Sequence, residues 1–302
     1  MGRVLFIGNG PNRLYEQSNS WEELLLVLAE YADKSRAIKH LIGYKPLSLV
    51  FEEICVLSQR VSRIRELELK RKAADLVKNI PSNEMHQRIV YSGVKHIITT
   101  NYDYNIESKS EAKHVKANVR KETKYSLFRR RKIGKQYVWH IHGEANFPNT
   151  LTMGHEQFSG SLQKIRSYTT SSKKKRFPER SPFIDRNPHF DTSNDYAWVD
   201  VFLRDDVYIL GFGLDYTEID IWWLLSYKAR LKLFKGYSVG KTDYYEFYNG
   251  VMKKEDEAKL SILKSLGVNV HAIEVDGNYE KAYDGFFDSI SNRSILGRST
   301  RV

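Results

Sequence analysis

The residues best suited to chemistry form a polar run, Thr99-Thr100-Asn101-Tyr102-Asp103, directly after a short apolar stretch. Residues 94–99 have the β-branched, apolar character of a buried strand. In a parallel α/β sheet, ligands bind just beyond the carboxyl ends of the strands. The amide of Asn101 and the carboxylate of Asp103 would then lie at that edge. The structural alternative is that one of them caps a helix following the strand.

A histidine supplies a second candidate group. Residues 137–143 are typical of a strand that ends at a glycine, and the alternation of side chains predicts His140 and His142 on one face. His142 falls at the carboxyl end of this strand, where Gly143 leaves room for a ligand. A histidine titrates near neutral pH and can act as a general base, although a histidine packed in the core is the simpler alternative. With His155 these histidines could form a metal trio, but no acid stands at ligand spacing, so we predict no metal site.

Glycine-rich turns follow two further predicted strands. Gly8-Asn9-Gly10-Pro11-Asn12-Arg13 comes after residues 3–7, and Gly211-Phe212-Gly213 leads towards Asp215. Glycines at a strand end let the backbone turn tightly and approach a phosphate closely. The first turn departs from the dinucleotide-binding pattern, because Arg13 occupies the place of its third glycine. Each turn alone is a weak signal, since such glycines also occur without a ligand.

The elements that must position these residues alternate between strands and helices. We predict strands at 3–7, 94–99, 137–143, 207–213, 244–248 and 268–275. Helices are expected after a capping box at Ser20–Glu23, from Pro46, over 59–80 as an exposed or interdomain helix, after Asp215 or Thr217, over 253–266 and after Gly277. This order predicts an α/β fold: a doubly wound, Rossmann-like parallel sheet of about six strands with helices on both faces.

We predict a single domain over 1–302, with a helical insertion at about 46–90 and basic insertions at about 107–136 and 161–197. The first basic insertion contains Arg129-Arg130-Arg131-Lys132 close to Tyr125 and Phe128. Basic residues interleaved with aromatics can bind single-stranded nucleic acid, although a solvated loop is the more common outcome. The second insertion is predicted to be a long loop or mobile lid.

Composition restricts the classes of function. The chain has 302 residues, 41% of them hydrophobic, and a formal net charge of +11, which suits an anionic partner such as nucleic acid, a dinucleotide or an acidic protein face. Its single cysteine, Cys55, excludes an internal disulfide and a zinc site made of cysteines alone. We expect no membrane span, because no apolar run approaches about 20 residues. Without a signal-peptide pattern and with so few thiols, a cytoplasmic location is expected.

Taken in chain order, four motifs resemble those of the sirtuin-like family: Gly8–Asn12, Thr100-Asn101-Tyr102-Asp103, His142-Gly143 and Gly211–Asp215. The spelling of the second motif, and of the run from Gly211 to Asp220, is similar to bacterial defence-associated sirtuin-like NAD hydrolases. The resemblance reaches both ends of the chain but leaves the two basic insertions outside its motifs.

This resemblance implies NAD as the substrate and a role for each motif. Asn101 would hold the nicotinamide ribose or the attacking water, Asp103 would face the nicotinamide carboxamide, and His142 would be the general base. The pyrophosphate would lie over backbone N–H groups of the first glycine turn, and the adenosine half beside the second. The residues implied in NAD binding are Gly8, Asn9, Gly10, Asn12, Thr100, Gly211, Gly213 and Asp215.

Two departures from the family bear on the reaction. Deacylating sirtuins usually carry a four-cysteine zinc module, which a chain with one cysteine cannot form. The first glycine turn also differs in detail from the Gly-Ala-Gly-Ile-Ser of the family. Without the module that shapes an acyl-lysine channel, water becomes the expected acceptor, and the expected products are nicotinamide and ADP-ribose.

The resemblance further implies an effector of bacterial anti-phage defence. Such a protein would form a homo-oligomer or act with a partner such as a motor ATPase or another phage-sensing component. The alternatives are a non-catalytic sensor or scaffold that binds NAD or ADP-ribose, an NAD-dependent protein deacylase, and a nucleic-acid-binding protein acting through its basic insertions.

Overall fold

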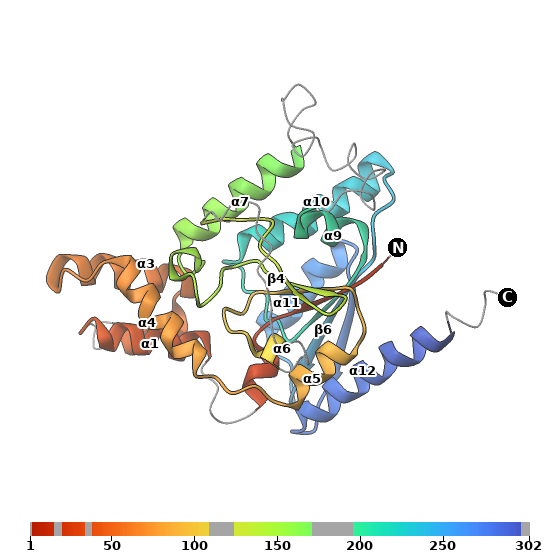
Figure 1. Cartoon of the computed structure of the whole chain (residues 1–302), viewed down its shortest axis with the longest axis horizontal. Coiled ribbons are helices and arrows are strands. Elements are labelled where there is room, and N and C mark those ends of the chain that lie inside the picture. The colour runs from red at the N-terminus through yellow and green to blue at the C-terminus, as the bar shows by residue number, and fades with distance from the viewer. Residues whose placement is uncertain (1, 15–19, 34–37, 109–123, 171–195, 297–302) are drawn as a thin grey trace.

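The computed structural model describes residues 2–14, 20–33, 38–108, 124–170 and 196–296, and a seven-stranded sheet in the order β3-β4-β2-β1-β5-β6-β7 forms its centre (Figure 1). All neighbouring strands in this order are parallel except β3 and β4. The strands are β1 Arg3–Ile7, β2 His96–Thr99, β3 Arg131–Ile133, β4 Gln136–His140, β5 Asp206–Leu210, β6 Thr242–Tyr248 and β7 Asn269–Glu274. The predicted Rossmann-like parallel sheet is confirmed, with β3 as an additional antiparallel edge strand.

The strand order changes direction at β1. The chain moves outwards from β1 through β2 to β4, and later outwards on the other side through β5, β6 and β7. Ile7 is paired with both Thr99 and Leu210, and Thr99 is paired with His140. These four residues are the last of their strands, so four strands end level at one edge of the sheet. A reversal of this kind opens a crevice outside the carboxyl ends of the strands.

Helices cover both faces of the sheet because its central strands are apolar on both sides. In Figure 1, α7, α9 and α10 lie on one side of the sheet, and α5 and α12 lie on the other. Leu260 and Leu263 of α11 belong to the same hydrophobic cluster as the helices of the first face. The helices are α5 Glu84–Tyr91, α6 Asn105–Ser108, α7 His155–Thr170, α9 Trp198–Arg204, α10 Ile219–Lys235, α11 Lys254–Ser265 and α12 Tyr279–Leu296.

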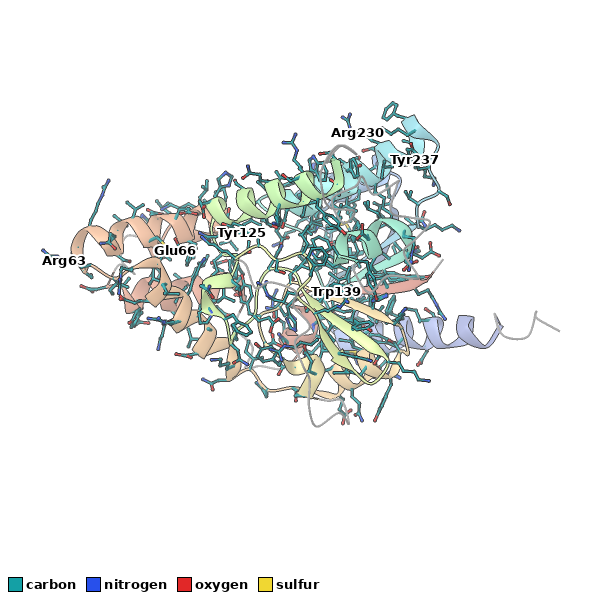
Figure 2. The ribbon with its side chains drawn as sticks, turned by 45° about the horizontal axis from the view of Figure 1, so that its top comes forward. Arg63, Glu66, Tyr125, Trp139, Arg230 and Tyr237 are labelled. Carbon is teal, nitrogen blue, oxygen red and sulfur yellow. The ribbon has the colours of Figure 1, made fainter. Side chains whose placement is uncertain are left out.

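A separate helical layer stands beside the sheet, between β1 and β2 in the chain (Figure 1). It consists of α1 Trp21–Tyr31, α3 Leu47–Val61 and α4 Glu66–Lys78, with a core of its own around Leu28, Phe51 and Leu69. The predicted capping box is present: the Glu23 N–H donates to Ser20 Oγ at 3.1 Å, and the Ser20 N–H donates to the Glu23 carboxylate. Figure 2 places Arg63 at the outer tip of this layer and Trp139 within the sheet.

The prediction of one exposed or interdomain helix over 59–80 is wrong, because two helices share this range. α3 ends at Val61, and α4 begins at Glu66 after a break in which Arg63 has a φ of 55°. Leu69, Ala73 and Ala74 of α4 are fully buried. They share one face of the helix with Lys70, which is also buried, and pack against α1, so most of the charge of this segment lies on the opposite face.

The expectation of a solvated loop is also wrong for the basic run at 129–131. Arg129 and Arg130 are buried, and the Arg130 guanidinium lies 5.0, 4.8 and 4.7 Å from the ring centroids of Tyr137, Trp139 and Tyr196. Arg131 pairs with the buried Glu144 at 2.7 Å. Aromatic faces and a carboxylate therefore replace water around these cations.

The rest of the basic insertions is only partly described. The stretches 109–123 and 171–195 lie outside the described residues. Where 161–197 is described, the predicted long loop or lid is instead the second half of α7, which extends to Thr170, followed by the buried Tyr196 and Ala197.

Candidate active site

A cavity of about 1140 Å³ opens at the sheet edge where the four strands end level. Its wall includes the turns after β1, β2, β4 and β5, the end of β6, the start of α12 and residues of the helical layer. Of the residues predicted to form the site, Asn9, Gly10, Thr100, Asn101, Asp103, His142, Gly211, Gly213 and Asp215 line this cavity. Gly8 and Asn12 are not in the cavity wall, but they form hydrogen bonds with Asn101 and Asp103, which are.

Asn101 is fixed by three hydrogen bonds at the end of β2. Its side-chain Nδ2 donates to the Gly8 carbonyl at 3.1 Å, its backbone N–H donates to Thr99 Oγ1 at 3.1 Å, and its backbone oxygen lies 2.9 Å from His140 Nδ1. None of these bonds uses Oδ1. The side chain is buried at the cavity wall, so its amide is held in place while its oxygen keeps its acceptor capacity.

His140 does not share a face with His142, contrary to the sequence prediction. β4 ends at His140, so the alternation of a strand does not continue to His142. His140 Nε2 lies 2.7 Å from Glu107 of α6. Burial disfavours the charged imidazolium, but the neighbouring Glu107 outweighs burial and raises the pKa of His140 to about 9. His140 is therefore a charged support beneath Asn101 rather than part of the cavity wall.

Asp103 lies at the cavity and also caps the helix that follows it. Its Oδ1 accepts a hydrogen bond from the N–H of Asn105, the first residue of α6, at 3.0 Å. Its Oδ2 accepts one from Asn12 Nδ2 at 2.8 Å, and burial raises its pKa. Asn12 Oδ1 in turn lies 3.0 Å from both Asn105 Nδ2 and His86 Nε2. Asn12 thus joins the turn after β1 to the start of α6.

The two glycine turns bind each other across the switch point. The Gly8 N–H donates to Leu210 O at 3.1 Å, and the Gly10 N–H donates to Gly211 O at 2.8 Å. A Cβ on Gly8 would lie 2.5 Å from Gly211 O, and Gly211 itself has a φ of 62°. The glycines are therefore required by this close approach of two backbones.

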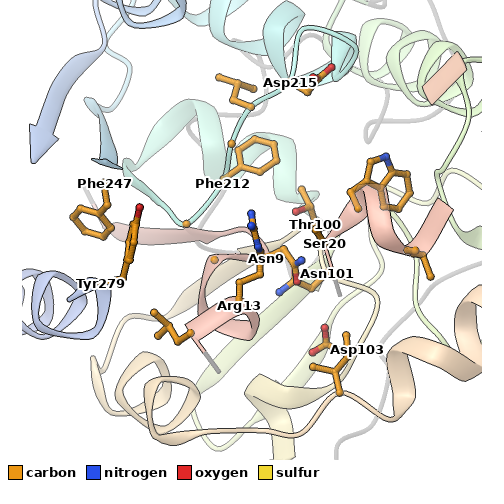
Figure 3. A pocket seen from close by; sticks show the side chains of 18 of the residues that line it. Asn9, Arg13, Ser20, Thr100, Asn101, Asp103, Phe212, Asp215, Phe247 and Tyr279 are labelled. Carbon is orange, nitrogen blue, oxygen red and sulfur yellow. The ribbon is translucent and has the colours of Figure 1, made fainter. Parts of the chain in front are cut away.

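Arg13 is a further candidate for binding the substrate. In the sequence it stood out only because it replaces the third glycine of the dinucleotide-binding pattern. Because the N–H groups of Gly8 and Gly10 serve the protein itself, a phosphate here would need another cation or donor. Arg13 is the only Lys or Arg lining the cavity among the described residues. Figure 3 shows it between Asn101 on one side and Phe247 and Tyr279 on the other.

His142 lines the cavity and is only 3% exposed. Its Nε2 lies 3.1 Å from Asp220 Oδ2, and the ring stands edge-on to Phe158 at a centroid distance of 5.2 Å. Sequence reasoning missed Asp220 as a site residue. The signal for it was an acid in the first turn of a helix that follows a glycine turn at a strand end.

A comparison with protein families finds a match to part of this chain. The model of the SIR2-like domain matches residues 95–267, which is more than half of the chain. The chain belongs to the SIR2-like family. The match contains Asn101, Asp103 and His142 and begins after the first glycine turn. A comparison with curated proteins finds no match.

The part of this SIR2-like cavity beyond β5 is lined by acids. Asp215, Glu218, Glu246, Asp276 and Glu280 all border it. The Asp215 N–H donates to the Glu218 carboxylate at 2.8 Å. Burial raises the pKa of Glu218 well above its usual range, and the nearby carboxylates of Asp220 and Asp215 raise it further. This end suits the hydroxyl and amino groups of a nucleoside better than it suits phosphate.

Within the residues that the structure describes, no group of three or more His, Cys, Asp or Glu side chains is arranged to hold a metal ion. His155 is exposed at the start of α7, away from the wall to which His142 belongs. No helix in the described ranges has the length and apolar character needed to cross a bilayer.

Proposed function

We propose that this SIR2-like protein hydrolyses NAD at the nicotinamide glycosidic bond and releases nicotinamide and ADP-ribose. The observation that carries the proposal is the meeting of Asn101, Asp103 and His142 on one cavity of about 1140 Å³ at the switch point of the sheet. Cavities that hold extended cofactors have volumes of this order. The family membership supports NAD as the molecule that enters it.

The residue types fit the charge changes of this reaction. Breaking the bond between ribose C1′ and the nicotinamide nitrogen builds positive charge on the ribose, and the bonding electron pair leaves with nicotinamide. Asn101 Oδ1 would accept a hydrogen bond from a water molecule whose oxygen attacks C1′. His142 would take one proton from that water. Holding the water and the ribose in one geometry contributes much of the acceleration.

The substrate would extend from Asp103 to the acidic end of the cavity. Nicotinamide would lie beside Asp103, which the network around Asn12 holds rigidly. The pyrophosphate would lie over Arg13 and Asn9, and the adenosine would lie beside Asp215 and Gly213. In this arrangement Arg13 supplies the positive charge that the described part of the wall otherwise lacks.

The helical layer favours water over an acyl-lysine acceptor. The single cysteine of the chain cannot form the four-cysteine zinc module that shapes an acyl-lysine channel in deacylating sirtuins. Apolar side chains of the helical layer line this cavity instead: Trp21, Leu24, Leu47, Leu76, Val77 and Ile80. We therefore propose hydrolysis as the reaction and deacylation as the less favoured one. The similarity to defence-associated sequences supports a role in depleting NAD during phage infection, as a homo-oligomer or with a phage-sensing partner.

The test is release of nicotinamide from NAD by the purified protein and by Asn101→Ala and His142→Ala. Each substitution is expected to lower kcat by at least about 100-fold, the usual contribution of such groups. Asn269→Ala and His155→Ala change the same residue types at exposed positions outside the cavity wall and are expected to retain full activity. Equal release from all variants would contradict the assignment, and tight binding of uncleaved NAD would indicate a sensor or scaffold.

A further inference from the structure

Asp220 connects three elements at the back of His142. It is fully buried in the first turn of α10. Its Oδ2 accepts a hydrogen bond from Ser161 Oγ of α7 at 2.8 Å and lies 3.1 Å from His142 Nε2. Its Oδ1 accepts a hydrogen bond from the Ile221 N–H at 2.9 Å. The carboxylate is thus held from both sides, and the dipole at a helix N-terminus favours its negative charge.

These contacts determine which nitrogen of His142 can act as a base. A carboxylate oxygen can only accept, so the contact with Asp220 requires a hydrogen on His142 Nε2. In the neutral ring the lone pair is then on Nδ1. Phe158, edge-on to the ring at 5.2 Å, restricts rotation of the imidazole. These contacts therefore favour one tautomer and one orientation of the neutral ring at the cavity wall.

We propose that Asp220 is a positioning residue that keeps the proton on His142 Nε2 and makes Nδ1 the base for the attacking water. This inference rests on the proposed function. As the water oxygen bonds to C1′, the bond from C1′ to nicotinamide breaks and its electron pair leaves with nicotinamide. One proton of the water moves to Nδ1, and the other stays on the new hydroxyl of ADP-ribose. Asp220 takes no proton and stabilises the imidazolium that forms.

Ser161 extends this arrangement to α7. Its hydroxyl donates to the same Oδ2 that faces His142, so it fixes the position of that oxygen. α7 packs closely along α10, and the Glu156 N–H near its start donates to Glu52 of the helical layer at 2.9 Å. The orientation of His142 is in this way coupled to the packing of α7.

The kinetic test uses Asp220→Asn and Asp220→Ala, with nicotinamide release from NAD as the readout. We expect kcat to fall by at least about 100-fold in both variants, while KM changes by less than about threefold, because Asp220 does not touch substrate. Ser161→Ala is expected to lower kcat by about threefold to tenfold, because it removes one hydrogen bond to the Asp220 carboxylate and leaves the carboxylate itself in place. The near-isosteric Asp220→Asn and the Ser161→Ala variant, which retains Asp220, keep the test valid if Asp220→Ala does not fold.

The matched control is Asp200→Asn. Asp200 is also a buried acid of the same face of the sheet, where it accepts hydrogen bonds from Tyr168 Oη and the Ala197 N–H, but it does not line the cavity. This variant is expected to lose stability and to keep kcat within about twofold. If Asp200→Asn lowers kcat as much as Asp220→Asn, the effect of Asp220 is structural and the inference is overturned.

A second measurement does not depend on turnover. The ¹⁵N chemical shifts of the His142 ring are expected to show the proton on Nε2 in the wild-type protein, and Ser161→Ala and Asp220→Asn are expected to disturb that state. A proton on Nδ1 in the wild-type protein would overturn the inference even if NAD is hydrolysed. A proton on Nε2 in a protein that cleaves no NAD would support the positioning by Asp220 and contradict the proposed function.

Discussion

At the residue scale, His140 and His142 are both buried and lie two positions apart, but their different partners give them different properties. His140 is enclosed against Glu107 and holds the backbone of Asn101, whereas His142 contacts Asp220 and borders the cavity. One is a charged structural group and the other is the candidate base. The residue type alone does not separate them, because a histidine takes its protonation state from its surroundings.

The pair of His140 and Glu107 predicts a dependence of stability on pH. The pKa of His140 in the folded protein, about 9, exceeds its value of about 6.5 in the unfolded chain. Its contribution to stability is therefore fully present below pH 6.5 and is lost as the pH rises through 9. Urea unfolding of Glu107→Gln should show a protein less stable than wild type at pH 6 and closer to wild type at pH 9.5. A constant difference across this range would contradict the pairing.

For Glu218, removal of the charge is expected to stabilise the protein, in contrast to the loss of stability expected for Glu107→Gln. Its pKa is raised by burial and then by Asp220 and Asp215, so its favourable contribution belongs to the protonated form and is lost as the pH rises through the raised pKa. Glu218→Gln should raise the melting temperature at pH 8 and leave it nearly unchanged at pH 4. Thermal unfolding at the two pH values tests this. A variant less stable than wild type at pH 8 would show that the ionised form is favoured in the folded state.

At the scale of elements, the cavity depends on how closely the turn after β1 approaches the turn after β5. Two backbone hydrogen bonds join these turns, from Gly8 to Leu210 and from Gly10 to Gly211. Side chains would separate the turns: a Cβ on Gly10 would lie 2.6 Å from the Cα of Gly211. The glycines therefore determine how closely the two turns approach each other at the switch point.

Gly8→Ala is expected to destabilise the protein by about 1–3 kcal/mol, the usual cost of overpacking. The reason is the backbone of Gly211 and Phe212, whose nearest atoms would lie 2.5 Å from the new methyl group and cannot rotate away. Gly285→Ala in α12 is the control, because its Cβ would meet nothing within 4 Å and its φ is not positive. Chemical denaturation should leave Gly285→Ala as stable as wild type or slightly more stable. Equal stability of both variants would contradict the close approach.

At the scale of the whole molecule, the basic run at 129–131 does not present its full charge to solvent. Arg129 and Arg130 are inside the protein, and Arg131 is paired with Glu144. Their contribution to a field that attracts nucleic acid is therefore smaller than the run of basic residues predicts. Binding of nucleic acid through the insertions stays a prediction that the described residues do not test.

Arg130→Ala is expected to lower the free energy of unfolding by at least about 2 kcal/mol, because a desolvated cation is lost from three aromatic faces. Lys132→Ala removes an exposed charge two positions away and should change stability by less than about 0.5 kcal/mol. Urea unfolding compares the two variants with wild type. If the two substitutions cost the same, Arg130 does not hold the segment in place.

The sequence by itself determined the order of strands and helices and the polar or glycine turns at the strand ends. These signals are local: apolar runs, glycines and a capping box act within a few residues. They were enough to predict the parallel sheet and, through the resemblance of four motifs, the family. Asn101 and His142 were found in this way because each lies two residues beyond the end of its own strand.

Only the tertiary structure decided which groups face each other. The contact between His142 and Asp220 joins residues 78 positions apart, and the level ends of four strands follow from their pairing. The same applies to Arg130, whose aromatic partners come from β4 and from Tyr196. Local patterns state what a segment can form, but partners over such separations are chosen by packing in three dimensions.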